Sequence, residues 1–448
     1  MTVTRQLADA YAALTFDALP DTAVQAALIS LADGLACMMA ATGEAAVAAP
    51  RLHAKRSSGH VTLFGDAARV TAAAAALGNG ALAHAADFED TFEAGMIHPN
   101  ASVIPAVLAL AEEEGATGPD ILTALVVGCD AACRLSLVIG TGPAKRGWYH
   151  PPIITAVGAA FACARLLHLT PAQTVDAVGL TLCQFSLGDG LIATPNSDLR
   201  AMREGLAARA AVEAARLAQL GTVAMAEPLF AKGGLAHLLL GEIPDPAQML
   251  GNIGTSFHGP DVGIKIWPAC RGTHGAIKLA LDLRAQGITP ADIARVDMAT
   301  IPVNRMLFEP VAQKHAPQSA IEGKFSTPFC FAAALVTGRF DLTSFAGSAL
   351  RDPAILALAA KVARSGDSQE AELEATVHLT DGRILSHAVT PKEWRIGDMQ
   401  LADLAPKITG CAQAGRVAFD PAAFLAAVAG LPENGLDPVL AALGHARG

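Results

Sequence analysis

The first 260 residues or so consist almost entirely of alanine- and leucine-rich segments in which apolar side chains recur at helical spacing. Alanine and leucine are strong helix formers, and aromatic residues make up only 5% of the chain, so packed helices are favoured over sheets. A mostly α fold is therefore expected. We predict helices near residues 5–15, 21–41, 44–54, 69–87, 101–114, 119–138, 151–168, 171–187, 203–220 and 246–251.

The pattern changes after about residue 263. Residues 296–302 are typical of a strand, and residues 375–390 are typical of a hairpin, because Asp381-Gly382 supplies a turn that needs positive φ. Helical segments at 329–337 and 353–362 lie between them, and the tail from about 400 to 445 is helical again.

At 448 residues the chain exceeds one typical core, so two domains are expected. The simplest architecture is a large all-α domain of residues 1–262, completed by residues 399–448. Residues 263–398 would form a smaller inserted α+β domain, the lid. The active site would lie in the cleft between the two domains, where small-molecule sites are common.

Composition excludes several classes of partner. The net charge of -10 leaves no basic stripe for nucleic acid or an acidic membrane surface. The most apolar windows, 121–140 and 152–169, are interrupted by charged residues and indicate buried helices rather than membrane spans. Eight scattered cysteines form no CxxC pair and no zinc spacing, and the N-terminus has no signal-peptide run, so we expect a cytoplasmic protein with reduced thiols and no metal. The hydrophobic content of 52% also indicates a homodimer built through the helical domain.

The densest group of reactive side chains lies in Lys265-Ile-Trp-Pro-Ala-Cys-Arg-Gly-Thr-His274. Only 17% of the residues are charged, yet this stretch holds three potential cations, Lys265, Arg271 and His274, next to Cys270. Helical spacing follows over 275–284, and the start of a helix offers unpaired N–H groups and a positive dipole end. The stretch is a candidate anion site.

A second polar group lies far upstream, in Asp87-Phe-Glu-Asp-Thr91 and His98-Pro-Asn100. Taken singly, these carboxylates can be the polar end of the preceding helix, and His98 can be a loop residue. Together with the cations of the first stretch, they are the groups needed for proton transfer on an anionic substrate.

With both stretches in view, the chain resembles the MmgE/PrpD family, which includes 2-methylcitrate dehydratase, cis-aconitate decarboxylase and iminodisuccinate epimerase. The resemblance covers nearly the whole chain and implies a helical domain with an inserted α+β lid, a homodimer, and no metal or organic cofactor. It rests on His84-Ala-Ala-Asp-Phe-Glu-Asp-Thr91, His98-Pro-Asn, Gly147-Trp-Tyr-His150-Pro, Gly205-Leu-Ala-Ala, Lys265-Ile-Trp-Pro-Ala-Cys-Arg-Gly-Thr-His274 and Gly323-Lys-Phe-Ser326.

The resemblance also implies the site residues. Arg271 and His274 match a Lys-x-x-Pro-x-Cys-Arg-x-x-His form of the motif that is common in the dehydratase-like branch. The residues expected to be catalytic are Asp87, His98, His150, Lys265 and His274. Those expected to bind substrate are Thr91, Arg200, Lys265, Cys270 and Arg271.

Four departures from the family pattern bear on the reaction. Arg200 stands where many members have lysine, and Cys270 stands where the decarboxylase has histidine. Phe329 replaces a family tyrosine, and Tyr149 is a one-residue insertion before His150. These differences count against decarboxylation of cis-aconitate and leave the substrate open.

The reactions of this family share the development of charge at a carbon next to a carboxylate, which a base and nearby cations must stabilise. Lys265 and Arg271 are suited to hold carboxylates, and Arg200 to hold a further one. His98 and His150, expected to titrate near neutrality, are suited to proton transfer, and Asp87 to orient a histidine or accept a substrate hydroxyl.

Three hypotheses follow for a small di- or tricarboxylate partner. The first is a cofactor-independent lyase that dehydrates a 2-methylcitrate-like hydroxy acid. The alternatives are an epimerase or isomerase of an amino- or imino-dicarboxylate, and a decarboxylase of a cis-aconitate-like acid. A non-catalytic carboxylate-binding protein is the hypothesis from another class, and the retained Asp, His, Lys and Arg positions count against it.

Overall fold

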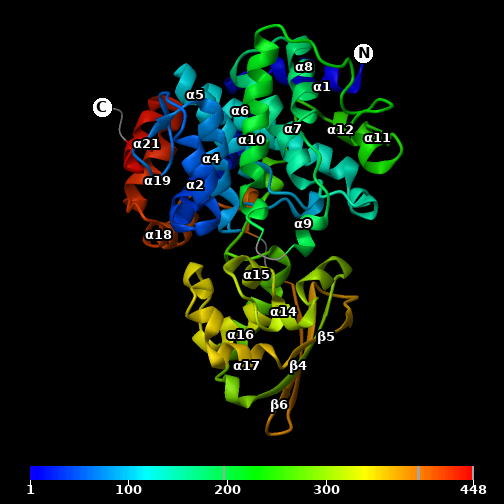
Figure 1. Cartoon of the computed structure of the whole chain (residues 1–448), viewed down its shortest axis with the longest axis vertical. Helices are drawn as coiled ribbons and strands as arrows, with labels where there is room; N and C mark the ends of the chain where they lie inside the picture. The colour runs from blue at the N-terminus through cyan, green and yellow to red at the C-terminus, as the bar shows by residue number, and fades with distance from the viewer. Residues whose placement is uncertain (195–196, 391–393, 446–448) are drawn as a thin grey trace. The chain divides into compact units, whose positions relative to one another are not determined.

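The computed structural model describes residues 1–194, 197–390 and 394–445. It divides into two compact units, one formed by Met1–Ile264 with Trp394–Gly448 and the other by Lys265–Glu393 (Figure 1). We call these the helical unit and the α+β unit. The sequence had placed the two boundaries after residues 262 and 398, whereas the units change at 264/265 and 393/394.

The helical unit contains nearly all of the helices that the periodicity predicted. Two predicted segments begin late: residues 44–54 yield a helix only from Ala48, and residues 69–70 form a short strand before the next helix. The helices are α1 Val3–Ala12, α2 Asp21–Ala40, α3 Ala48–Ala54, α4 Ala72–Ala85, α5 Pro99–Glu114, α6 Gly118–Ile139, α7 Pro151–Leu166, α8 Pro171–Leu182, α9 Gly190–Ala193, α10 Leu199–Gln219, α11 Leu235–Leu240, α12 Ala247–Leu250, α18 Ala405–Ala414, α19 Pro421–Ala429, α20 Leu431–Asn434 and α21 Asp437–Ala442. Two-stranded ribbons are formed by β1 Val61–Thr62 with β2 Arg69–Val70, and by β3 Gly263–Ile264 with β8 Trp394–Arg395.

Helices α4 and α10 cross in backbone contact, as Figure 1 lets the reader follow. A Cβ on Gly205 would lie 2.2 Å from the carbonyl oxygen of Leu77, and one on Gly80 would lie 2.6 Å from the Cα of Gly205. The glycine of the Gly205-Leu-Ala-Ala motif is therefore required for this crossing. The crossing brings the first turns of α10 next to the loop that follows α4.

Helices α2 and α6 are long and apolar enough, by length and composition alone, to cross a membrane. Their apolar windows are 89% buried inside the helical unit, as in the core helices of water-soluble proteins. The C-terminal helices α18 and α19 pack on α2, so the end of the chain completes the same core (Figure 1).

The α+β unit is built on a four-stranded sheet in the order β5-β4-β6-β7. Strand β6 alternates buried and half-buried residues, and its buried set belongs to one apolar core with residues of α13 and α16. The strands are β4 Ile293–Thr300, β5 Val362–Asp367, β6 Leu373–Leu379 and β7 Ile384–Val389; the helices are α13 His274–Ala285, α14 Val311–His315, α15 Ala320–Lys324, α16 Thr327–Thr337 and α17 Pro353–Ala359.

The predicted hairpin is β6–β7, and Gly382 takes the expected positive φ of 89°. The sequence missed β5: residue 362, predicted as the end of a helix, instead begins a strand parallel to β4. Parallel pairing joins segments far apart in the chain, so local pattern gives no signal for it.

Candidate active site

The loop after α4 carries the first acidic group. Helix α4 ends at Ala85, and Asp87 adopts the left-handed conformation with φ 49°, which is unusual for a residue other than glycine. Its N–H donates to the carbonyl of His84 at 2.9 Å. This turn directs the chain inward, so that Asp87, Glu89 and Asp90 are all buried rather than forming a solvated helix end.

His98 immediately precedes α5 and occupies its N-cap position. Its Nδ1 lies 2.7 Å from the backbone carbonyl oxygen of Asp90, which can only accept, so Nδ1 carries a proton. Nε2 is then the basic nitrogen of the neutral ring. The backbone thus fixes the tautomer that suits His98 to accept a proton.

Asp90 itself is held as a carboxylic acid. Its Oδ2 accepts a 2.6 Å hydrogen bond from Nδ2 of Asn100, but complete burial dominates and raises its pKa to about 8. Asp33 and Glu89 add to this rise through charge repulsion. Asp90 therefore shapes the loop without adding a charge at neutral pH.

Four potential ligand groups, one of them His98, converge in this loop region. One ligand atom from each of His84, Asp87, Glu89 and His98 lies within 4.8 Å of the others. Nδ1 of His84 pairs with Oε1 of Glu89, and the same oxygen is 3.6 Å from Nδ1 of His98. This set has the chemistry to hold a divalent transition ion, although the sequence predicted no metal. The groups also partner one another directly, as groups in a proton-transfer network do.

The N-terminal ends of three helices meet next to this cluster. The carboxylate of Glu204, in the second turn of α10, accepts hydrogen bonds from Ser102 near the start of α5 and Thr155 near the start of α7. The two hydroxyls are 3.0 Å apart. Each helix carries partial positive charge at its N-terminus, so the arrangement suits an anionic group, and the carboxylate of Glu204 itself lies there.

His150 occupies the N-cap of α7, as His98 does for α5. The expectation that His150 titrates near neutrality is wrong, because burial lowers its pKa to about 4. His150 is therefore neutral at physiological pH. The inserted Tyr149 lies under the guanidinium of Arg203, 4.8 Å from ring centre to Cζ, and its N–H donates to Leu187.

Arg200 and Thr91 are two further residues that the motifs assigned to substrate binding. Arg200 is the second residue of α10 and is largely buried. Thr91 forms a two-way backbone bridge with Gly263, at 2.8 Å and 2.7 Å. Lys265 follows Gly263 by two residues, so the strand paired with Thr91 leads directly into the buried lysine that begins the α+β unit.

The remaining predicted residues lie in the α+β unit. Nη1 of Arg271 is 2.8 Å and 2.9 Å from the two carboxylate oxygens of Glu372, an ion pair that competes with its expected role in substrate binding. Nε2 of His274 lies 3.1 Å from the carbonyl of Trp267, which indicates a role in shaping the loop. The N–H of Cys270 donates to the carbonyl of Lys324.

Two residues that the sequence motifs did not identify, Asp33 and Lys407, hold the loop that carries Asp87, Glu89 and Asp90. Lys407, on the C-terminal helix α18, forms a 2.6 Å ion pair with Asp33 of α2 and donates to the carbonyl oxygen of Phe88 at 2.6 Å. Asp33 and Cys37 hold the pKa of Lys407 above its ordinary value despite burial. The pair fixes the loop between Asp87 and Glu89. No local pattern links residues so far apart in the chain.

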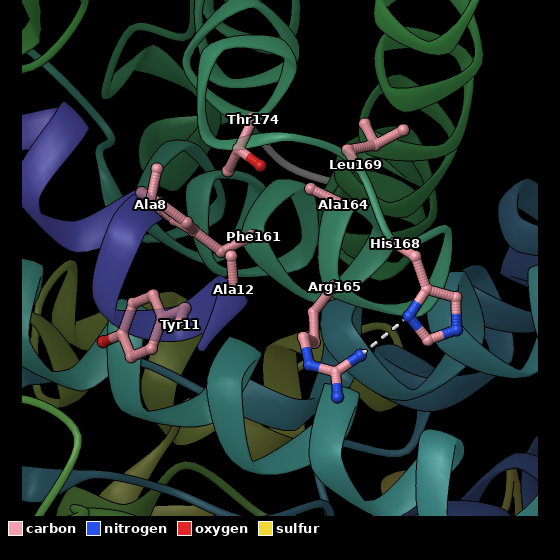
Figure 2. A pocket seen from close by; sticks show the side chains of 9 residues that line it. All are labelled: Ala8, Tyr11, Ala12, Phe161, Ala164, Arg165, His168, Leu169 and Thr174. Atoms are coloured by element: carbon pink, nitrogen blue, oxygen red, sulfur yellow. Dashed lines mark hydrogen bonds between the residues drawn. The ribbon is translucent and has the colours of Figure 1, made fainter. Parts of the chain in front are cut away.

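A separate hollow of about 100 Å³ lies between α1, α7 and α8 (Figure 2). Arg165 and His168 line it, with Nη1 of the arginine 3.2 Å from Nδ1 of the histidine. None of the predicted site residues lines it, and its lining is otherwise mostly apolar. It is therefore distinct from the candidate site.

Comparison with known proteins decides the family. The MmgE/PrpD N-terminal domain matches residues 5–245, and the MmgE/PrpD C-terminal domain matches residues 267–414. The chain belongs to the MmgE/PrpD family. This confirms the resemblance drawn from the sequence motifs.

Curated relatives within the MmgE/PrpD family carry one activity in their names. A cis-aconitate decarboxylase-like protein of Aspergillus oryzae is 28% identical over 86% of this chain and 83% of its own length. A cis-aconitate decarboxylase of Aspergillus terreus is 26% identical over 83% of this chain and 79% of its own. The cis-aconitate decarboxylase of Homo sapiens is 25% identical over 64% of this chain and 60% of its own. These relatives fit a lyase-type enzyme and favour the decarboxylase alternative over the dehydratase that the sequence analysis put first.

Proposed function

We propose that this protein is a lyase that decarboxylates a cis-aconitate-like unsaturated tricarboxylate without an added cofactor. The observation that carries the proposal is the meeting of three helix N-termini beside a histidine whose tautomer is fixed for proton transfer. The buried cations Arg200 and Lys265 would pair with the carboxylates of a polyanion, and a histidine suited to proton transfer lies next to the helix ends. The names of the relatives identify the substrate class.

The reaction needs one bond to break and one to form. The bond between a carboxylate carbon and its neighbouring carbon breaks, CO₂ leaves, and the electron pair spreads over the double bond toward a remaining carboxylate. A proton then adds to carbon, giving an unsaturated dicarboxylate. Arg200 and Lys265 would stabilise the negative charge on the substrate. His98, carrying a proton on Nε2, would donate it to carbon.

Dehydration of a 2-methylcitrate-like hydroxy acid is the second candidate. Cys270 stands where the decarboxylase has histidine, and the Lys-x-x-Pro-x-Cys-Arg-x-x-His pattern is common in the dehydratase-like branch. In that reaction His98 would remove the proton next to a carboxylate while hydroxide leaves. Epimerisation of an amino- or imino-dicarboxylate is the third candidate and uses the same proton transfer.

The test is product analysis of chelator-treated enzyme in D₂O, with cis-aconitate, 2-methylcitrate and an amino-dicarboxylate as separate substrates. Release of CO₂ with deuterium in an unsaturated dicarboxylate would support decarboxylation. An unsaturated product from 2-methylcitrate alone would establish the second candidate, and exchange with inversion the third. The His98→Gln variant is the control for contaminating activity. Loss of turnover on chelation, restored by a divalent ion, would contradict independence from metals.

A further inference from the structure

We propose that Arg203 is a further substrate-binding residue of this site and holds the third carboxylate of a tricarboxylate. The proposal rests on the proposed function only for the polycarboxylate class of substrate. Arg203 lies in the second turn of α10 and is 3% exposed. The sequence motifs gave it no role, although they placed Arg200, three residues earlier, among the carboxylate-binding residues.

Arg200 and Arg203 lie on one face of α10. Residues three apart in a helix are neighbours on its surface, so the two guanidinium groups project from the same side of the first two turns. Both residues are largely buried, although like charges repel each other and the start of a helix already carries partial positive charge. Oε1 of Glu204 lies 3.1 Å from Nε of Arg203 and offsets part of this charge. The binding of a further anion would stabilise the arrangement.

The protein leaves donors of Arg203 unused. Among the residues that the structure describes, neither Nε nor Nη1 of Arg203 has an acceptor in hydrogen-bond geometry, the nearby carboxylate oxygen included. Arg134 of α6, which is 2% exposed, is the contrast. Its Nε donates to Asp130 at 2.7 Å, and its Nη1 and Nη2 donate to the backbone carbonyls of Gly251 and Ser256. Burying an N–H group without an acceptor is costly, so the unused donors of Arg203 indicate a ligand with acceptor oxygens.

Tyr149 holds the guanidinium of Arg203 in place. Cζ of Arg203 lies 4.8 Å from the centre of the tyrosine ring, and the ring face attracts the cation without accepting at the edge of the guanidinium. The N–H of Tyr149 donates to the carbonyl of Leu187 at 2.9 Å, which fixes the loop that carries the ring. His150 follows directly as the N-cap of α7. The stacking therefore leaves the edge of the guanidinium to a carboxylate.

A third bound carboxylate changes which substrates fit. A guanidinium binds a carboxylate through charge-assisted hydrogen bonds, which are stronger than those between neutral groups. A tricarboxylate would pair with Arg203 as well as with Arg200 and Lys265, to which the proposed function assigns the negative charge of the substrate. A dicarboxylate would leave one of these buried cations without its carboxylate, which is costly. The enzyme should therefore prefer three carboxylates to two.

The test is the binding of three unreactive probes to the full-length protein, measured by isothermal titration calorimetry. Tricarballylate is propane-1,2,3-tricarboxylate, whereas glutarate lacks its central carboxylate and methylsuccinate lacks one terminal carboxylate. The preference is the ratio of the affinity for tricarballylate to that for the tighter-binding dicarboxylate. It should be about 10–100-fold in the wild type. In Arg203→Gln the third carboxylate has lost its partner, so the preference should disappear.

Arg216→Gln is the matched control. It removes a positive charge from the same helix, but Arg216 lies in the last turn of α10 and pairs with Glu113 and Glu114. Its preference should equal that of the wild type. Tyr149→Leu removes the ring and keeps the charge of Arg203, so it should lower the preference by about 2–5-fold. If Arg203→Gln does not fold, an unchanged preference in Tyr149→Leu would overturn the proposal.

A preference that survives in folded Arg203→Gln would overturn the proposal. So would an equal loss of affinity for all three probes, which is the result expected if Arg203 only supports the fold. Loss of the preference in Arg203→Gln, together with a wild type inactive on cis-aconitate, would uphold the proposal and reject only the proposed reaction. A wild type that decarboxylates cis-aconitate but binds tricarballylate and a dicarboxylate equally would overturn the proposal and leave the proposed function standing.

Discussion

At the candidate site, the surroundings of single residues set the tautomer and the charge of their side chains. The carbonyl of Asp90 sets the tautomer of His98, and burial alone makes His150 neutral. Sequence motifs identified both histidines but assigned them the same titration behaviour. The structure separates them, because Oε1 of Glu89 lies 3.6 Å from Nδ1 of His98, whereas burial lowers the pKa of His150.

Substitution of His98 and of Lys265 should impair activity in different ways. His98→Ala should lower kcat by about 10²–10⁴-fold with a smaller change in KM, as for a lost general acid or base. Lys265→Ala should raise KM strongly and lower kcat as well, because a misplaced substrate loses transition-state contacts. Steady-state kinetics on the substrate that the product analysis identifies would measure both. Near-native kcat in His98→Ala would make His98 only a loop residue.

Asp90 should make stability depend on pH. Because burial raises its pKa from 3.8 to about 8, the unfolded chain releases this proton at lower pH than the folded protein does. The group therefore costs stability progressively as pH rises from about 4 to about 8. Asp90→Asn removes the titration, so its stability relative to the wild type should increase over that window. Urea unfolding at several pH values measures the difference, and parallel curves would contradict the assignment.

At the scale of elements, the site depends on helices whose ends meet. The N-terminal parts of α5, α7 and α10 are joined by Ser102, Thr155 and Glu204, and α10 is also held in backbone contact with α4 at Gly205. Periodicity predicted these helices individually. It contains no information on which ends converge.

Gly205→Ala should disrupt this arrangement. The new Cβ would lie 2.2 Å from the carbonyl oxygen of Leu77 and 2.8 Å from the amide nitrogen of Ala81, and backbone cannot move aside as a side chain can. We expect a loss of about 1–3 kcal/mol in the free energy of unfolding. Gly410→Ala is the control, because this glycine lies inside α18 with nothing within 4 Å of its Cβ position. It should stabilise by about 0.4–1 kcal/mol, and equal effects in urea unfolding would contradict the crossing.

At the scale of the whole molecule, the helical unit has exposed apolar surface that a subunit interface would cover. Leu220 and Val223, at and beyond the end of α10, are 83% and 81% exposed. A hollow of about 460 Å³ beside them includes Leu217 and Leu220. Charged residues, Glu113, Glu213 and Arg216, also line this hollow, so its apolar residues lie within a polar rim, as at many association sites.

We therefore expect a homodimer formed through the helical unit. Light scattering at micromolar concentration should give twice the 45.8 kDa of one chain. The mass of a single chain under these conditions would contradict the expectation. The measurement is independent of the substrate.

The sequence by itself determined the helical class, the β6–β7 hairpin at Asp381-Gly382 and the family, because periodicity, turn residues and motifs are local properties of the chain. It also gathered Asp87, His98 and Lys265 as candidates. Tertiary structure alone decided the parallel pairing of β5, the ion pair that brings Lys407 under Phe88, and the contacts of Glu89 and Glu204. These depend on burial and on residues distant in the chain. The physical reason is that titratable side chains are desolvated, and meet partners distant in the chain, only once the core has formed. Burial and these partners decide where a proton resides and with which group a carboxylate pairs.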